Sequence, residues 1–222
     1  MIKYYNSLSW RLGTQLKTRE PDLFEFDNRH QGYLKKYFLL STLFVLSLFS
    51  GQSIFAQGPA NDYTFATSTG ATLDPMTGST LIGAAPNDDT PYAASSIGFN
   101  FVYETTTYTQ FSASPDGFMR LGGTTASSQF SNALTSATNV PKLAPLWDDN
   151  DGAQASAVAS YLTTGSPGNR VFTFEWLNWE WNYTANSAVI SFQVKLYEAD
   201  GKIEFIYRSD ANAAVSTSAS IG

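Results

Sequence analysis

The chain has 222 residues, of which 43% are hydrophobic and 15% aromatic, which is enough apolar surface for a packed core. It contains no cysteine, and this excludes disulfides, thiolate chemistry and cysteine-based zinc sites. The charge is uneven, with seven Lys and Arg against four Asp and Glu in residues 1–56, and six against fifteen in residues 57–222. The acidic second part repels phosphate backbones, so we expect no nucleic-acid partner.

Residues 34–56 have the three-part pattern of a secretory signal peptide. Lys35-Lys36 precedes an uncharged apolar run over residues 37–49, and Ala56 is the small residue at the end. The run is shorter than the roughly 20 residues that a permanent membrane anchor needs. We therefore expect a signal-peptide helix, cleavage after Ala56, a secreted or cell-surface protein, and no permanent membrane span in the mature chain.

The two ends of the chain lie outside this pattern. Residues 1–33 have mixed charge and no clear periodicity, and we interpret them as a misannotated or disordered upstream extension, with translation starting at Leu34. The mature domain is expected to span residues 57–222. Residues 211–222 begin what resembles one more strand and then stop, which predicts that this domain is truncated at its C-terminus.

Short strands alternate with turn signals along the mature part, at intervals of about ten residues. Residues 114–117, with the sequence SPDG, place Pro and Gly where a tight turn needs a fixed and a permissive backbone. Within residues 188–197 the even positions are apolar, and Ser191, Gln193 and Lys195 lie opposite, which predicts one buried and one solvent-exposed face. We expect an all-β fold, an antiparallel β-sandwich of the jelly-roll or immunoglobulin-like two-sheet type.

The residue types exclude most catalytic mechanisms. The one histidine is His30, so residues 57–222 have neither His nor Cys for nucleophilic triads or zinc hydrolysis. Gly122-Gly123 lacks the lysine and the following helix of a phosphate-binding loop. Glu175 and Glu180 are the best carboxylate pair, but residues five apart in a strand point to opposite faces. We expect no enzyme activity and no catalytic residues.

Three aspartates directly follow an apolar segment in KLAPLWDDNDG, residues 142–152. Asp148, Asp149 and Asp151 offer hard oxygen ligands for Ca²⁺, and Asp88-Asp89 offers more if the fold brings that loop near. The spacing lacks the alternating ligands and distant Glu of a helix-loop-helix calcium site. In water, neighbouring carboxylates repel by only about 1 kcal/mol per pair at about 4 Å, so we favour a solvated turn over a calcium site.

An aromatic strip is the second candidate surface. In a strand, Trp179, Trp181 and Tyr183 share one face, and such a row could bind sugar rings or a partner protein. Trp176 falls on the other face, where we expect the core. Aromatic residues in sheets more often pack than bind, so burial of the row is the alternative, and it would remove the site.

Several stretches in a fixed order resemble a known family. They are Pro145-Leu-Trp147-Asp148-Asp149, Phe174-Glu-Trp176, and Phe192-Gln-Val-Lys-Leu-Tyr197 followed by Gly201-Lys-Ile-Glu-Phe205. The order resembles nidogen-like extracellular domains. It is more similar still to the N-terminal β-sandwich domains of large secreted or surface proteins of Bacteroidota, which also share Tyr63-x-Phe65, Phe111-Ser112 and Arg120-Leu-Gly122. The resemblance implies a β-sandwich, export and often the type IX secretion route, and it implies no catalytic residues.

These observations together predict a non-catalytic extracellular binding or adhesion module. Its expected partner is an extracellular glycan or protein surface. The alternative is a glycan-binding, lectin-like or accessory domain of a secreted polysaccharide-degrading system. Ca²⁺ is the one cofactor that the sequence leaves open.

Overall fold

The computed structural model describes residues 5–12, 63–83, 87–185, 187–210, 212 and 218–222. The chain divides into two compact units, one made of Met1–Gly13 with Gln57–Gly222 and the other of Thr14–Ala56. The second unit, and with it the expected signal peptide, lies outside the described residues. Within those residues we find no apolar helix of the length that crossing a membrane requires.

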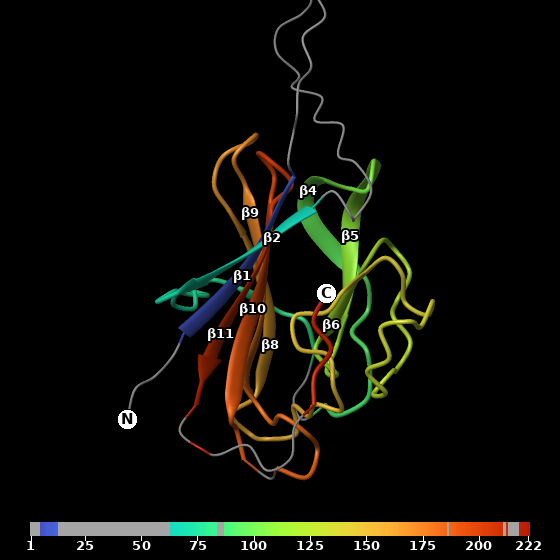
Figure 1. Cartoon of the computed structure of the whole chain (residues 1–222), viewed down its shortest axis with the longest axis vertical. Helices are drawn as coiled ribbons and strands as arrows, with labels where there is room; N and C mark the ends of the chain where they lie inside the picture. Colours follow the sequence, from blue (N-terminus) through green and yellow to red (C-terminus); the bar gives the residue numbers. More distant parts are fainter. Residues whose placement is uncertain (1–4, 13–62, 84–86, 186, 211, 213–217) are drawn as a thin grey trace, which may run out of the picture. The chain divides into compact units, whose positions relative to one another are not determined.

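The described residues fold into two antiparallel sheets that pack face to face (Figure 1). The larger sheet contains β1 (Tyr5–Leu12), β2 (Tyr63–Thr69), β3 (Thr80–Leu81), β8 (Val158–Thr164), β9 (Val171–Trp179), β10 (Ile190–Tyr197) and β11 (Ile203–Ser209). The smaller sheet contains β4 (Ser95–Tyr103), β5 (Thr106–Ser114), β6 (Phe118–Leu121) and β7 (Lys142–Leu143). Their orders are β2-β1-β11-β10-β9-β8-β3 and β4-β5-β6-β7. The predicted all-β sandwich is confirmed.

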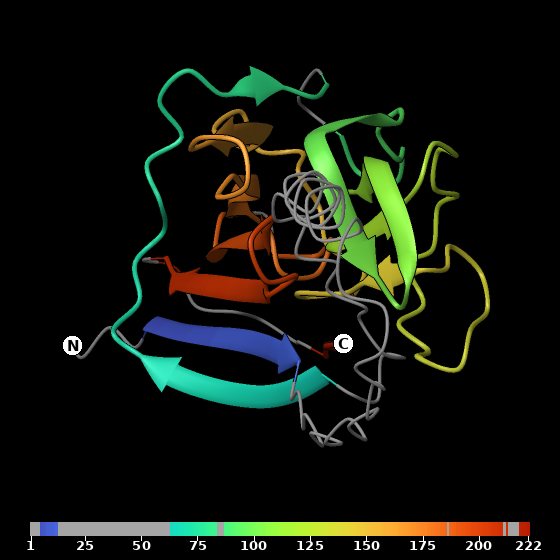
Figure 2. The same cartoon turned by 90° about the horizontal axis from the view of Figure 1, so that it is seen from above.

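Strand β1 lies between β2 and β11 in the larger sheet (Figure 2). It is antiparallel to both neighbours, with Trp10 opposite Ile203 on β11 and Leu12 opposite Tyr63 on β2. Residues 5–12 therefore contribute a paired strand to the sandwich. The boundaries that we assign to the upstream extension and to the signal peptide stay predictions.

Aromatic side chains from both sheets form the core. Phe111 of β5 is fully buried against Tyr161 of β8 and against Phe172 and Phe174 of β9, with ring centroids 5.2, 4.7 and 5.6 Å away. These tilted and edge-on contacts fill the space between the layers. The alternation of apolar residues along β5 and β9 thus produces one continuous core.

The outer face of β10 is buried, which corrects the prediction of a solvent-exposed face there. Ser191, Gln193 and Lys195 are all buried. The loop between β2 and β3 covers Gln193, whose side chain donates to Asp74 O and accepts from Asp74 N, both at 2.9 Å, and Asp74 also pairs with Lys195. Alternation in sequence reports polarity, whereas the path of a distant loop decides burial.

Phe111 provides a test of the contact between the sheets. We predict that Phe111→Ala lowers the free energy of unfolding by about 3–5 kcal/mol, because it removes the side chain that touches both layers and leaves a cavity. The matched control is Leu81→Ala, since Leu81 is 67% exposed, and it should change stability by less than about 0.5 kcal/mol. Urea unfolding measures both. Equal effects would contradict the core described above.

Candidate functional site

The tight turn between β5 and β6 is held by the loop that follows β7. Gly117 N donates to Ser114 O at 3.2 Å and closes the turn, as the sequence predicts. The turn then contacts the loop through its backbone, with Leu146 N donating to Gly117 O and Asp148 N to Asp116 O, both at 3.2 Å. These bonds place Asp116 beside the aspartates at 148–151.

Two buried tryptophans of β9 bind the same turn from the opposite sheet. Trp176 Nε1 donates to Ser114 O and Trp179 Nε1 donates to Pro115 O, both at 2.9 Å. A buried carbonyl that loses its donor costs free energy, so these bonds fix the position of the turn. The two indole hydrogen bonds therefore also position Asp116, which follows Pro115 in the turn.

A bulge in β9 puts both tryptophans on the core side. Trp176 pairs with Phe192 and Trp179 pairs with Ile190, so three steps along β9 match two along β10. Asn178 takes a positive φ of 56°, a conformation that Asn tolerates better than most residues. The extra residue reverses the alternation of side chains beyond Trp176.

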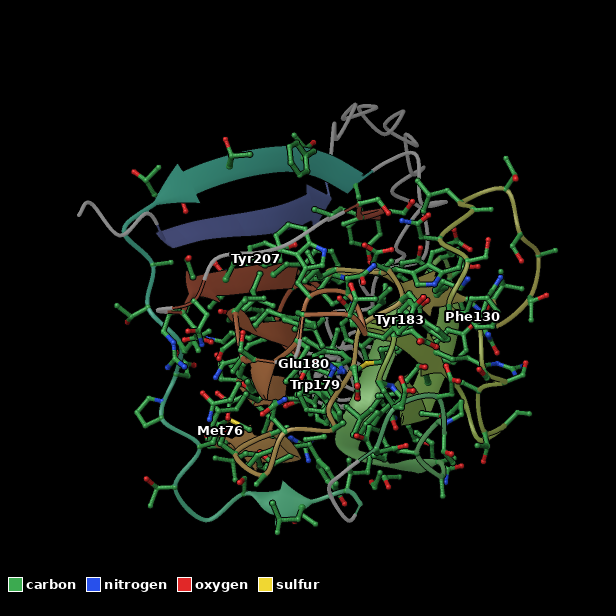
Figure 3. The ribbon with its side chains drawn as sticks, turned by 90° about the horizontal axis from the view of Figure 1, so that it is seen from below. Met76, Phe130, Trp179, Glu180, Tyr183 and Tyr207 are labelled. Atoms are coloured by element: carbon green, nitrogen blue, oxygen red, sulfur yellow. The ribbon has the colours of Figure 1, made fainter. Side chains whose placement is uncertain are left out.

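The bulge also determines which residues of the expected aromatic row are exposed. Trp179 is 1% exposed and so lies in the core, whereas Tyr183 is 55% exposed (Figure 3). Trp181 is half-buried and donates its Nε1 to Ser218 O at 2.9 Å. The structure therefore does not bring Trp179, Trp181 and Tyr183 together as one exposed surface.

One isolated bridge joins the loop before β4 to the aspartate segment, and a second joins that segment to the residue that follows β9. Asn87 and Gly152 exchange backbone hydrogen bonds of 3.4 and 3.1 Å, and Asp151 and Glu180 exchange bonds of 3.2 and 2.9 Å. Asn87 also closes its own turn, accepting from Thr90 N at 3.1 Å. Residues 88 and 89 follow directly, so this loop lies beside the aspartate segment.

Three carboxylates converge where these loops meet. One oxygen from each of Asp89, Asp116 and Asp149 lies within 4.8 Å of the others. We call these three residues the acidic cluster. Asp89 is exposed, Asp149 is half-buried and Asp116 is fully buried. Within the described part of the chain, no ion pair joins any of them to a lysine or arginine.

Burial and like charge raise the pKa values in and around the acidic cluster. Burial raises the pKa of Asp116 to about 7, and the charges of Asp89 and Asp149 add to this shift. The pKa of Asp149 is raised by burial and then by Asp89 and Asp88. The pKa of Asp151 is raised to about 6, again by burial first and then by Asp88. All the charged groups that shift these pKa values are carboxylates, so the region is strongly electronegative.

The other two aspartates of the segment have structural partners. Asp148 accepts from Ser218 N and Ser218 Oγ, both at 2.9 Å, and Asp151 accepts from Ala153 N at 2.6 Å. Of the metal ligands considered from the sequence, Asp149 and Asp89 come together, while Asp148 and Asp151 lie outside the acidic cluster. The sequence does not indicate Asp116 as a ligand, because its context of Pro115 and Gly117 predicts only a turn.

The two glutamates considered for catalysis are both buried. Glu175 accepts from Gln193 Nε2 at 2.8 Å, and burial raises its pKa. Glu180 accepts from Gln154 Nε2. A general acid or base must reach its substrate, and neither side chain is accessible to one.

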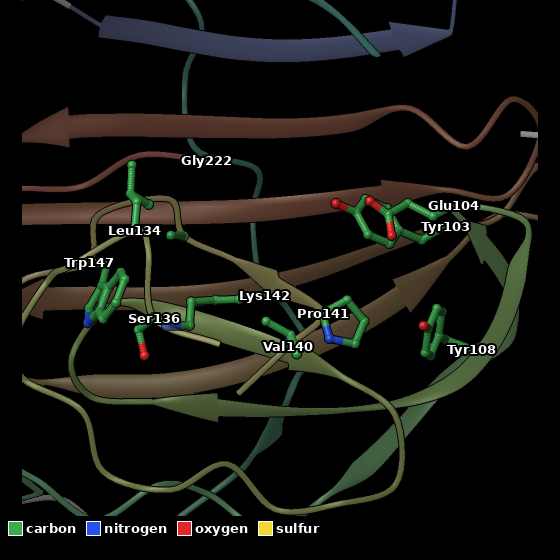
Figure 4. A pocket seen from close by; sticks show the side chains of 11 residues that line it. Tyr103, Glu104, Tyr108, Leu134, Ser136, Val140, Pro141, Lys142, Trp147 and Gly222 are labelled. Carbon is green, nitrogen blue, oxygen red and sulfur yellow. The ribbon is translucent and has the colours of Figure 1, made fainter. Parts of the chain in front are cut away.

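A groove of about 430 Å³ lies along the smaller sheet, between the β4–β5 turn and the loop that leads into β7 (Figure 4). Its lining includes Tyr103, Tyr108, Val140, Lys142 and Gly222. Burial lowers the pKa of Lys142 to about 8. No member of the acidic cluster lines this groove, so the two features are distinct.

The sandwich and its loops form an all-β domain in which Glu175 and Glu180 are buried. Residues 62–222 match the profile of the NIDO-related family, and because the match covers more than half of the chain, the protein belongs to that family. This confirms the nidogen-like part of the resemblance. No curated protein and no solved structure gives a significant match.

Gly117 tests how closely the turn and the loop pack. A Cβ there would lie 2.1 Å from Leu146 O, and its φ is +76°. We predict that Gly117→Ala lowers the free energy of unfolding by more than about 3 kcal/mol, because backbone strain and a backbone clash add. Gly78→Ala is the matched control, since its φ is +80° and nothing lies within 4 Å. It should cost only about 1–2 kcal/mol. Equal losses in urea unfolding would show that the contact is loose.

A second test asks whether the indole hydrogen bond of Trp179 stabilises the β5–β6 turn. Trp179→Phe removes the partner of Pro115 O inside the core, and we expect a loss of about 1–3 kcal/mol from the unsatisfied carbonyl, in addition to lost packing. Trp181→Phe is the control, because the carbonyl of Ser218 lies in an exposed hydrogen bond where water can replace the donor. Thermal unfolding compares the two. A larger effect at Trp181 would contradict the role given to Trp179.

Proposed function

We propose that this NIDO-related domain is a non-catalytic binding or adhesion module of a secreted or cell-surface protein. The family match over residues 62–222 carries the proposal, because it identifies an extracellular-type domain. A rigid sandwich that presents loops is a common scaffold for binding. Export through the signal peptide at residues 34–56, whose cleavage after Ala56 would separate β1 from the mature chain, belongs to the same proposal. The similarity to secreted Bacteroidota proteins of the type IX route belongs to it as well.

The burial of Asp116, Glu175 and Glu180 supports a role without catalysis. Burial raises the pKa of Asp116 to about 7, and its side chain is 0% exposed. Glu175 and Glu180 are buried as well. Acid–base catalysis needs a group within hydrogen-bond reach of the substrate. Residues 57–222 also lack His and Cys, so the common nucleophilic mechanisms have no base.

The exposed side chains favour a protein partner over a glycan. Phe130, Leu134 and Val140 are large apolar residues exposed on the loop between β6 and β7, where Figure 3 labels Phe130. Exposed apolar residues gathered on one loop are typical of protein-binding surfaces. The glycan-binding alternative, a lectin-like or accessory domain, relied on an aromatic row, and Trp179 of that row is buried.

The proposal predicts binding without bond cleavage. The purified chain should release no reducing sugar from cellulose, chitin, xylan or mannan, because Glu175 and Glu180, the pair considered for catalysis, are buried. It should bind protein-coated biosensor surfaces more strongly than a glycan array, and the double variant Phe130→Ser with Leu134→Ser should weaken that binding.

Tyr183→Ala is the matched control, because Tyr183 is exposed but lies outside this loop. It should leave protein binding unchanged. Sugar release would contradict the proposal outright. Glycan binding that is lost in Tyr183→Ala would favour the lectin-like alternative.

A further inference from the structure

We propose that the acidic cluster of Asp89, Asp116 and Asp149 binds one Ca²⁺ ion where three loops meet. The ligands come from the loop before β4, the β5–β6 turn and the loop after β7. This set differs from the consecutive aspartates that the sequence indicates, since it shares only Asp149 with Asp148, Asp149 and Asp151.

The spacing of the oxygens suits a single ion. Calcium binds oxygen ligands at about 2.3–2.6 Å, so two ligands of one ion are separated by at most about 5 Å. The three carboxylate oxygens lie within 4.8 Å of one another. These separations fall below that limit, so they are compatible with three ligands of a single ion.

An unpartnered buried oxygen points independently to a cation. Asp116 Oδ2 accepts from Ser114 Oγ at 2.8 Å and from Gln129 N at 3.3 Å. Asp116 Oδ1 is buried, and no described residue donates to it. A buried carboxylate oxygen that has no donor is costly, and a bound cation would compensate for that cost. Oδ1 is therefore the oxygen of Asp116 that is available for coordination.

Asn150, the residue after Asp149, also has a buried side-chain oxygen to which no residue of the described part of the chain donates. Its Nδ2 donates to Leu146 O at 2.6 Å and lies 3.3 Å from Asp116 O, so the amide is fixed against the β5–β6 turn. Its Oδ1 is buried and has no partner among the described residues. Amide oxygens are ordinary calcium ligands, so an ion within reach of Asn150 Oδ1 would satisfy this oxygen as well.

The chemistry of the donors selects calcium among the common ions. All the candidate ligands are oxygens, which hard cations prefer, and residues 57–222 offer no His or Cys for softer metals. Magnesium demands near-ideal octahedral geometry, whereas calcium accepts six to eight ligands in irregular arrangements. Ligands from three separate loops fit the less demanding ion, with water completing its shell.

Thermal unfolding of the full chain tests the site. After dialysis against EDTA, adding about 10 mM CaCl₂ should raise the melting temperature by about 5–10 °C, if the dissociation constant is about 0.1 mM, as for extracellular modules. Titration calorimetry should show one Ca²⁺ per chain, and MgCl₂ at the same concentration should have a much smaller effect. No calcium-dependent shift and no binding heat would overturn the proposal, and an equal response to Mg²⁺ would overturn the assignment to calcium.

Two variants separate the site from general stability. Asp116→Asn keeps an acceptor for Ser114 and Gln129 but removes the buried charge, so in EDTA it should melt no lower than wild type, and it should lose the calcium shift. Asp89→Asn changes an exposed residue and should fold normally while weakening calcium binding at least tenfold. Asp200→Asn, in the exposed β10–β11 turn, is the matched control and should keep the full shift. A full calcium response in Asp89→Asn or Asp116→Asn would overturn the proposal.

Discussion

Two indole N–H groups connect the sheets at the position on which the candidate site depends. Trp176 and Trp179 of β9 donate to consecutive backbone carbonyls, Ser114 O and Pro115 O, in the turn of the opposite sheet. Core packing holds the layers together without directional preference, whereas hydrogen bonds inside the core fix one register of turn against strand. Asp116 is the next residue, so its location follows from these two bonds.

Backbone hydrogen bonds bring the acidic cluster together, although its three carboxylates repel one another. Bridges between Asn87 and Gly152, and between the turn and residues 146–148, bring the three loops together. Burial raises the pKa of Asp116 to about 7, and repulsion from Asp89 and Asp149 adds to this shift. For the calcium site that we propose, the fold would already bear the cost of gathering the ligands.

Part of the site could be recognised before the fold was known. The oxygen-rich segment around Asp149 and the Asp88-Asp89 pair are visible as candidate ligands, because carboxylates gathered in loops suit hard cations. Asp116 is visible only as a turn residue, because its partners come from segments far away in the chain. For the aromatic row, in contrast, the sequence predicted a shared surface that the structure does not have. Period-two alternation predicted a shared face, and one extra residue near Asn178 put Trp179 in the core.

The sequence by itself determined the all-β class, the β5–β6 turn and the absence of His and Cys from residues 57–222, because alternation, turn residues and composition are local properties. It also carried the order of motifs that identifies a nidogen-like domain. Only the tertiary structure decided which loops meet, that the polar face of β10 is covered, and that Asp116 joins Asp89 and Asp149. The physical reason is that burial and ligand geometry arise from contacts between residues distant in the chain, and one bulge or one covering loop is enough to reverse a local pattern.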